Sequence, residues 1–282
     1  MLPTGNFADD LLFITVRLSS TNGVGTGFFF QTKKGTVIIV SNKHFVMNEK
    51  LPAPSTPIIQ TIKIVLHLDN DTNVTFKGDV EWYIHPTEDL AFFQFKPIEQ
   101  LVNTKTAPAK VIYKEIQDAM ILSATDLKSL TALEEVVMVG YPGGLYDEKN
   151  NLPLLRYGRT ASHPSVDFNG EKRGLIDVLC IPGSSGSPVF LFNELHVSVN
   201  DEMANFGPRS LFLGVEVAMP TKIKPVRQLV KDSSNGKYLV NTDGSLITIG
   251  TDYVYTDDIG LGYYIKGSEI QGFYPQFTAL GI

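Results

Sequence analysis

Short runs of β-branched and aromatic residues, each bounded by turn signals, recur along most of this chain. Runs of about four to eight such residues predict β-strands. Asn22-Gly23, placed between two of them, is a strong β-hairpin signal. Short helices are expected near residues 126–130 and after the last strand. The sequence therefore predicts an all-β protein, with strands at residues 11–18, 28–30, 36–41, 61–68, 74–84, 90–95, 135–140, 154–161, 175–179, 188–192, 211–218 and 261–265.

A glycine-framed serine loop, Gly183-Ser184-Ser185-Gly186-Ser187-Pro188, lies between two of these strands. Glycine on either side of a serine lets the backbone adopt positive φ angles and lets another molecule approach closely. The backbone amides of Gly183 and Ser185 can then point at one spot and stabilise a developing oxyanion. Clusters of glycine and serine usually form ordinary turns, so the loop indicates catalysis only together with other residues.

Two polar residues upstream lie at the ends of strand-like runs. His44 follows the β-branched run at residues 37–40, and Asp89 comes just before the apolar run at residues 90–93. A serine hydroxyl needs a base to take its proton, and a carboxylate holds that base in one tautomer. Because His44, Asp89 and Ser185 supply these parts, we expect them to form a catalytic triad.

The sequence resembles the chymotrypsin/trypsin-fold serine peptidases in four segments that stand in the family's order. These are Gly25-Thr26-Gly27-Phe28-Phe29, Val40-Ser41-Asn42-Lys43-His44-Phe45, Glu88-Asp89-Leu90-Ala91 and the serine loop. The intervals of 45 residues from His44 to Asp89 and 96 residues from Asp89 to Ser185 also suit that family. Asp177 and the stretch Val137-Met138-Val139-Gly140-Tyr141-Pro142 further resemble the intracellular trypsin-like branch related to the high-temperature-requirement proteases.

This resemblance implies two six-stranded antiparallel Greek-key β-barrels with the active site between them. Residues 1–98 would form an N-terminal barrel that carries His44 and Asp89, and residues 99–132 would connect the barrels. Residues 133–282 would form a C-terminal barrel that carries Ser185, with an inserted hairpin and a short C-terminal helix. Turn signals within residues 232–236 and 241–244 indicate that hairpin.

In this family, the residues five and six positions before the nucleophile line the pocket for the substrate side chain at the cut. Here they are Cys180 and Leu179, which indicate an apolar pocket for small or medium aliphatic side chains. Glu216 lies in a strand whose alternation points it away from Val215 and Val217, toward either solvent or the pocket. A Glu216 that lined the pocket would instead favour a basic side chain.

Composition limits the other classes of function. The net charge of −6 argues against nucleic acid as the main ligand, because phosphate binding needs a concentrated basic face. No Cys/His cluster has metal-ligand spacing and no Walker-type loop is present, so we expect neither a metal nor another cofactor. Cys180 is the only cysteine, and no signal peptide or membrane-spanning run is visible. We therefore expect a cytoplasmic protein without a membrane partner.

Three functions stay open at this point. The first is a trypsin-like serine endopeptidase that hydrolyses peptide bonds in protein substrates through an acyl-enzyme intermediate. The second is a latent protease that a regulatory protein partner activates, by analogy with modules of larger bacterial stress or defence assemblies. The third is a peptide-binding module that kept the fold without the catalysis. The complete set of His44, Asp89 and Ser185 favours the first.

Overall fold

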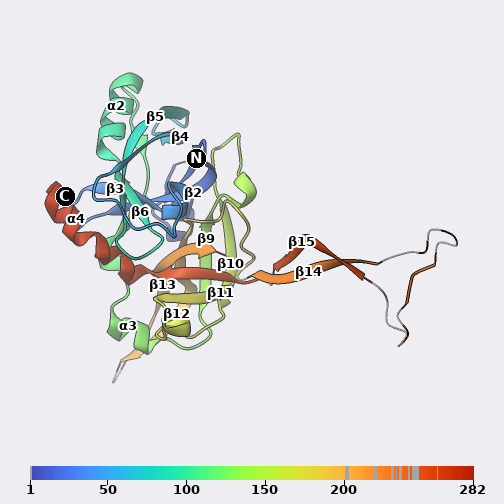
Figure 1. The fold of residues 1–282 in the computed structure, drawn as a ribbon. Helices are drawn as coiled ribbons and strands as arrows, with labels where there is room; N and C mark the ends of the chain where they lie inside the picture. Colours follow the sequence, from blue (N-terminus) through green and yellow to red (C-terminus); the bar gives the residue numbers. More distant parts are fainter. Residues whose placement is uncertain are drawn as a thin grey trace. The chain divides into compact units, whose positions relative to one another are not determined.

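The computed structural model of the protein describes residues 2–200, 203–218, 221–229, 232, 234, 237–240, 242, 248–258 and 260–282. The chain divides into two compact units. One consists of Met1–Ala218 with Leu261–Ile282, and the other is Met219–Gly260. The first unit contains two β-barrels, and Figure 1 labels most of their strands.

The first barrel closes from six antiparallel strands in the order β1-β2-β3-β6-β5-β4, and β4 returns to β1 where Lys63 pairs with Ser19. The short strand β7 (Val111–Ile112) extends it on β4, and β8 (Ile116–Gln117) pairs in parallel with β2. The barrel strands are β1 (Thr15–Ser20), β2 (Gly23–Gln31), β3 (Val37–Ser41), β4 (Ile58–Leu68), β5 (Asn73–Ile84) and β6 (Ala91–Gln94).

The second barrel is also closed and antiparallel, in the order β10-β11-β16-β13-β12-β9. Its last strand, β16, comes from the C-terminal segment and pairs with both β11 and β13. Together the two barrels confirm the predicted fold class. The strands are β9 (Glu135–Gly140), β10 (Leu154–Thr160), β11 (Arg173–Asp177), β12 (Pro188–Asn200), β13 (Met203–Ala218) and β16 (Gly262–Lys266).

Three central strands of the first barrel, β2, β3 and β6, bury side chains on both faces. In β2, Phe29 points into the barrel, while Phe28 and Phe30 pack into a second core shared with the other barrel. β3 repeats the pattern, with Ile39 on the inner face. Alternate side chains of a strand point to opposite faces. Three consecutive buried phenylalanines therefore indicate a strand that lies between two hydrophobic cores and contributes side chains to both. Phe28 meets Phe212 of β13 across this interface, with ring centroids 5.7 Å apart.

The predicted strand at residues 11–18 is wrong in its first half. The side chain of Asn6 caps a short helix by accepting from the Ala8 N–H at 2.9 Å, and the chain stays helical through Phe13 before β1 begins at Thr15. The helices are α1 (Phe7–Asp10), α2 (Lys96–Thr106), α3 (Ala124–Ser129) and α4 (Tyr274–Leu280), with 3₁₀ turns η1 (Leu11–Phe13), η2 (Lys43–Phe45), η3 (Asp118–Met120), η4 (Pro142–Gly144), η5 (Phe168–Gly170) and η6 (Gly267–Phe273).

The described residues of the second unit include an antiparallel pair, β14 (Thr221–Leu229) with β15 (Thr248–Asp258). Of the turn signals that indicated an inserted hairpin, residues 233, 235–236, 241 and 243–244 lie outside the described residues.

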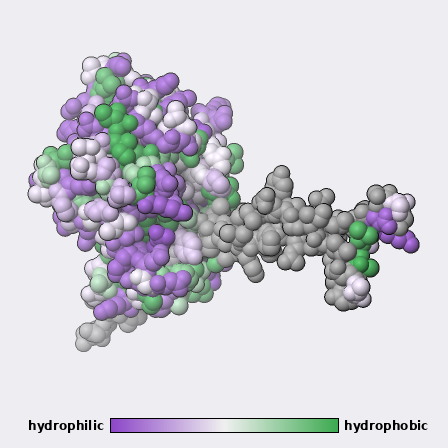
Figure 2. Space-filling model, viewed as in Figure 1, coloured by the Kyte–Doolittle hydropathy of each residue, from purple (hydrophilic) through white to green (hydrophobic). Residues whose placement is uncertain are grey.

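The surface in the view of Figure 2 carries separate hydrophobic spots among hydrophilic residues. This agrees with the wide spread of exposed large apolar side chains along the sequence, such as Ile59, Leu101 and Tyr157. None of the helices in the described part of the chain has the length and apolar character needed to span a membrane.

Candidate active site

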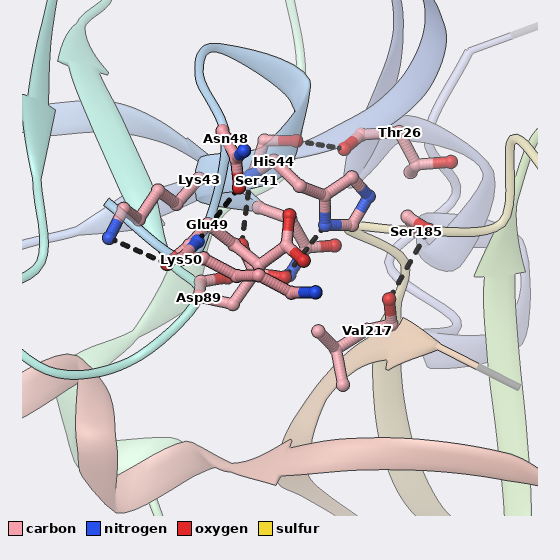
Figure 3. A network of polar contacts seen from close by, with 11 residues as sticks. Thr26, Ser41, Lys43, His44, Asn48, Glu49, Lys50, Asp89, Ser185 and Val217 are labelled. Atoms are coloured by element: carbon pink, nitrogen blue, oxygen red, sulfur yellow. Dashed lines mark hydrogen bonds and ion pairs between the residues drawn. The ribbon is translucent and has the colours of Figure 1, made fainter. Parts of the chain in front are cut away.

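His44 and Asp89 are in direct contact. His44 lies on η2, directly after β3, and the Asp89 carboxylate accepts from its backbone N–H at 2.8 Å and from its Nδ1 at 2.7 Å. Asn42 adds a bond from its side-chain Nδ2 to the Asp89 backbone carbonyl, at 2.8 Å. An ionised carboxylate can only accept, so Nδ1 of the neutral ring carries the proton and Nε2 is left as an acceptor. The structure therefore brings two of the predicted site residues together (Figure 3).

Burial and charge act in opposite directions on the His44 ring. Burial lowers its pKa, whereas the hydrogen bond and the charge of Asp89, helped by the charges of Glu216 and Glu49, raise it. The net effect is a pKa above the ordinary value of histidine. The surroundings thus stabilise the protonated ring, the form that a general base takes when it has accepted a proton.

The serine loop is held largely by Thr26 of β2. The Thr26 N–H donates to the Ser185 carbonyl at 2.9 Å, and its Oγ1 donates to the Gly183 carbonyl at 3.0 Å. A Cβ added to Gly186 would lie 2.0 Å from the Thr26 carbonyl oxygen and 2.8 Å from Ser41 Oγ. Only glycine therefore lets the loop approach β2 this closely.

The direction of the Gly183 amide is set by its peptide plane. The carbonyl of Pro182 accepts from the Gly143 N–H at 2.7 Å. The N–H and C=O of a trans peptide point in opposite directions, so the Gly183 N–H faces away from Gly143. Gly183 has a φ of 94°, and a Cβ there would lie 2.7 Å from the Tyr141 carbonyl oxygen.

The Ser185 amide is fixed in the same way. The carbonyl of Ser184 accepts from the Ser187 N–H at 2.9 Å, which turns the Ser185 N–H to the other side of that peptide. Within the described part of the chain, neither the Gly183 nor the Ser185 amide donates to another group. Two unused amides on one rigid loop are suited to bind an oxyanion.

The Ser185 side chain lies beside His44 without bonding to it. Its Oγ is 3.5 Å from the Val217 backbone carbonyl oxygen, and no hydrogen bond joins Ser185 to His44 among the residues described. In the view of Figure 3, the imidazole lies between the Asp89 carboxylate and Ser185. A Cβ on Gly25 would be 3.1 Å from the Phe45 ring and 3.7 Å from the Ser185 carbonyl oxygen. The segments that carry the histidine and the serine therefore meet at this glycine.

The three predicted pocket residues differ in exposure. Leu179 is 56% exposed, whereas Cys180 and Glu216 are buried. The solvent-facing alternative for Glu216 is wrong, because the residue is 2% exposed and its carboxyl hydrogen-bonds to Cys180. Burial raises the pKa of Glu216 to about 7, although Cys180 and the positive charge of Arg156 act to lower it. One carboxyl oxygen, Oε2, has no hydrogen-bond partner in the described part of the chain.

His85, the other histidine near Asp89, is committed to structural contacts. Its Nδ1 accepts from the N–H groups of Thr87 and Glu88, at 3.2 and 2.8 Å, so Nε2 donates to the Glu269 carbonyl at 3.0 Å. Burial lowers the pKa of His85 to about 4. The described residues hold no group of three or more His, Cys, Asp or Glu side chains that could bind a metal ion.

Two closed six-stranded barrels of this kind define the chymotrypsin-like class of double-barrel folds. Residues 25–197, more than half of the chain, match the family model of the trypsin-like peptidase domain. The protein therefore belongs to this family, and membership supports a hydrolase that acts on peptide bonds.

Several solved protease structures are similar to this chain at low identity. An inactive form of Rv3671c from M. tuberculosis H37Rv is 14% identical, with a TM-score of 0.42 over 98% of this chain and 92% of that one. The HtrA-type protease AlgW with a tripeptide is 12% identical, with a TM-score of 0.46, and the match covers 97% of this chain and 63% of AlgW. A serine protease of human pathogenic astrovirus is 14% identical, with a TM-score of 0.36 over 71% and 89% of the two chains. No curated protein matches the sequence.

Two residues that support the site were missed by the sequence analysis. Thr26 was named only as part of a segment that resembles the family, although its side chain bonds to a carbonyl 157 positions away. Arg156 of β10 was not singled out at all, yet its guanidinium donates to Ser184 Oγ at 2.6 Å. Neither position carries a local signal, because both contacts arise only when distant strands come together.

Proposed function

We propose that the protein is a trypsin-like serine endopeptidase that cleaves peptide bonds in protein substrates. The observation that carries the proposal is the contact of the Asp89 carboxylate with both the backbone N–H and Nδ1 of His44. This contact leaves Nε2 of His44 as a hydrogen-bond acceptor next to Ser185 (Figure 3). A serine, a base and an orienting carboxylate are the parts required to make a hydroxyl nucleophilic at neutral pH.

In the proposed reaction, Ser185 Oγ attacks the carbonyl carbon of the scissile peptide while His44 Nε2 takes the hydroxyl proton. Asp89 stabilises the imidazolium that forms. The amides of Gly183 and Ser185 donate to the oxyanion, with each donor contributing roughly 3 to 4 kcal/mol to lowering the barrier. His44 then passes its proton to the leaving amine, and water hydrolyses the acyl-enzyme to release the second product.

We further propose an uncharged aliphatic side chain at the cut. Leu179 offers an exposed apolar surface next to the buried Cys180. Glu216 already hydrogen-bonds to Cys180 and lies near the positive charge of Arg156, so it is poorly suited to receive a substrate lysine or arginine. In a library of peptides that differ at this position, we expect alanine, valine and leucine to be cleaved faster than lysine and arginine. Faster cleavage after lysine and arginine would instead indicate that Glu216 lines the pocket and binds the basic side chain of the substrate.

Labelling with a fluorophosphonate probe tests the assignment of Ser185. The wild type is expected to label, and Ser185→Ala is expected to lose labelling completely while keeping its unfolding curve. Ser187→Ala is the matched control, because Ser187 lies on the same loop and its hydroxyl hydrogen-bonds to Thr26 Oγ1 at 3.3 Å rather than to a residue of the proposed triad. Labelling that persists in Ser185→Ala would contradict the assignment.

A second candidate is a latent protease that a protein partner or the substrate activates. It is favoured by the Ser185 hydroxyl, which lies near the Val217 carbonyl and does not donate to His44 in the described structure. A folded wild type that labels only after a partner or a peptide is added would support this candidate, and unaided labelling would argue against it. The cytoplasmic location, the lack of nucleic-acid and membrane partners, and the domain division at residues 98 and 132 stay predictions.

A further inference from the structure

Arg156 lies beneath the serine loop, on a strand whose neighbouring side chains point outward. In β10, Leu155, Tyr157 and Arg159 are exposed, whereas Arg156 points inward and is partly buried. Partial burial of a guanidinium is costly where its donors and its charge are not matched. In Arg156, Nη1 and Nη2 are paired, whereas Nε has no hydrogen-bond partner in the described part of the chain. The groups that it contacts therefore indicate why an arginine is kept there.

The guanidinium bridges the two ends of the segment that precedes Ser185. Its Nη1 donates to the backbone carbonyl of Leu179, and its Nη2 donates to the side-chain Oγ of Ser184 at 2.6 Å. Ser184 is completely buried, and its backbone N–H also bonds to the Ile181 carbonyl at 2.9 Å. A planar fork of donors can fix two acceptors at once, which a lysine ammonium cannot do with the same geometry.

The bridged segment contains groups that the proposed reaction depends on. Cys180 lies within it, and so does Gly183, whose amide is one of the two proposed oxyanion donors. The buried Glu216 lies near Arg156, since its carboxyl interacts with the charge of Arg156 and bonds to Cys180. Arg156 is thus coupled to the pocket wall through Glu216 and to the serine loop through Ser184.

We propose that Arg156 is a positioning residue, which fixes the serine loop by clamping the Leu179 carbonyl and the Ser184 hydroxyl. The inference rests on the proposed function, because the fixed geometry matters for catalysis only if Ser185 is the nucleophile. Arg156 does not touch the reacting atoms. It acts by holding the loop so that the Gly183 amide and Ser185 keep their orientation. Thr26 and Gly143 contribute to the same orientation through their hydrogen bonds to carbonyl groups of the loop.

Two measurements on Arg156→Ala, Ser184→Ala and Arg159→Ala test this proposal. Arg159 is the matched control, because it lies on the same strand, is 54% exposed and pairs with Glu135 only at 3.9 Å. The first measurement is amide hydrogen exchange of residues 179–187, made in a Ser185→Ala background. The second is the rate of fluorophosphonate labelling of the same variants with Ser185 intact. It is measured without and with guanidinium chloride, at concentrations far below those that denature the protein.

We expect Arg156→Ala to speed amide exchange in residues 179–187 and to slow labelling by about tenfold to a hundredfold, since small displacements of reacting groups have effects of this size. Added guanidinium should restore part of the labelling rate, an effect that lost packing alone would not produce. Arg159→Ala should match the wild type. Ser184→Ala should show the same two changes as Arg156→Ala in weaker form, and it carries the test if Arg156→Ala does not fold.

Exchange in residues 179–187 that is as slow in the variants as in the wild type would overturn the proposal. Faster amide exchange with an unchanged labelling rate would also overturn it, because Arg156 would then stabilise the loop without affecting the reactivity of Ser185. A wild type that never labels would refute the protease proposal, while the exchange measurement would still decide whether Arg156 holds the loop.

Discussion

Thr26→Val is predicted to be the most informative single change in the protein outside the proposed triad. Thr26 is fully buried. Its hydroxyl donates to the Gly183 carbonyl at 3.0 Å and accepts from the Tyr141 N–H at 3.2 Å and from Ser187 Oγ at 3.3 Å. Valine keeps the shape of the side chain and the backbone bond to Ser185, but it removes all three contacts of the hydroxyl.

The expected loss of stability follows from the groups left behind. The Gly183 carbonyl and the Tyr141 N–H belong to the backbone and cannot turn to other partners, whereas the Ser187 hydroxyl can rotate. A buried polar group that loses its partner costs about 1 to 3 kcal/mol. Two such groups give an expected decrease of about 2 to 6 kcal/mol in the free energy of unfolding. Valine itself is a good strand former, so the backbone should not add to the loss.

Thr15→Val is the matched control. Thr15 lies in β1 and is 3% exposed, and its Oγ1 has no hydrogen-bond partner among the described residues. The same substitution there removes an unpaired buried hydroxyl, so stability should stay unchanged or rise by about 1 kcal/mol.

Urea unfolding followed by tryptophan fluorescence measures both variants. Trp82 is the only tryptophan and is fully buried in the core of the first barrel, so its emission reports the loss of that core. The reasoning would be refuted if Thr26→Val unfolded at the same urea concentration as Thr15→Val. A normal fluorophosphonate labelling rate in folded Thr26→Val would separately refute the role of Thr26 in setting the loop.

The remaining predictions concern charge and backbone geometry. Asp89→Asn should slow labelling by about a thousandfold or more, because it leaves His44 without its charged partner; a smaller loss would contradict the triad. The same Asp89 raises the pKa of His44, so the wild-type labelling rate should fall with decreasing pH on a limb that lies above pH 6.5, and Asp89→Asn should move this limb to lower pH. Gly183→Ala should cut labelling by about a hundredfold or more, since its Cβ would meet the Tyr141 carbonyl oxygen at 2.7 Å; near-normal labelling would exclude the Gly183 amide as a donor. His85 has a pKa of about 4 in the folded protein, so between pH 6.5 and 4 the unfolded chain binds a proton that the folded protein does not, and stability falls as the pH is lowered. His85→Gln should therefore reduce the decrease of the urea unfolding midpoint over this pH interval. Plots of midpoint against pH that run parallel for the variant and the wild type would show that His85 does not contribute.

The sequence was sufficient to predict those parts of the fold that depend on local patterns. Alternating and continuous apolar runs predicted the barrel strands, and glycine predicted the positions in the serine loop where φ is positive, 94° at Gly183 and 88° at Gly186. The strand ends were harder to predict. β12 and β13 pair as far as Asn200 and Met203, well beyond the predicted ends at residues 192 and 211, because backbone pairing does not require apolar side chains.

The contacts that shape the candidate site could not be predicted from local patterns. The side-chain bond of Thr26 spans 157 positions and that of Arg156 to Ser184 spans 28. Such contacts depend on how strands from different parts of the chain are placed, and their residues look ordinary in sequence. Glu216 illustrates the point. The alternation of the strand placed its side chain on the face opposite Val215 and Val217 but did not decide between solvent and the pocket, and its burial excludes only solvent.

The geometry of the serine loop is therefore determined mainly by residues outside it. The loop supplies glycines where a Cβ would collide, while Thr26 comes from the first barrel and Arg156 from the second. β2, which carries Thr26, also carries Phe28 and Phe30, and both pack into the core that the two barrels share. A shift in the docking of the barrels would consequently move the Thr26 hydroxyl away from the Gly183 carbonyl. Because protein interiors are close-packed and do not deform gradually, the proposed oxyanion donors should align only once that shared core has formed. On the proposed function, a partly folded chain would thus lack hydrolytic activity even with His44, Asp89 and Ser185 all present.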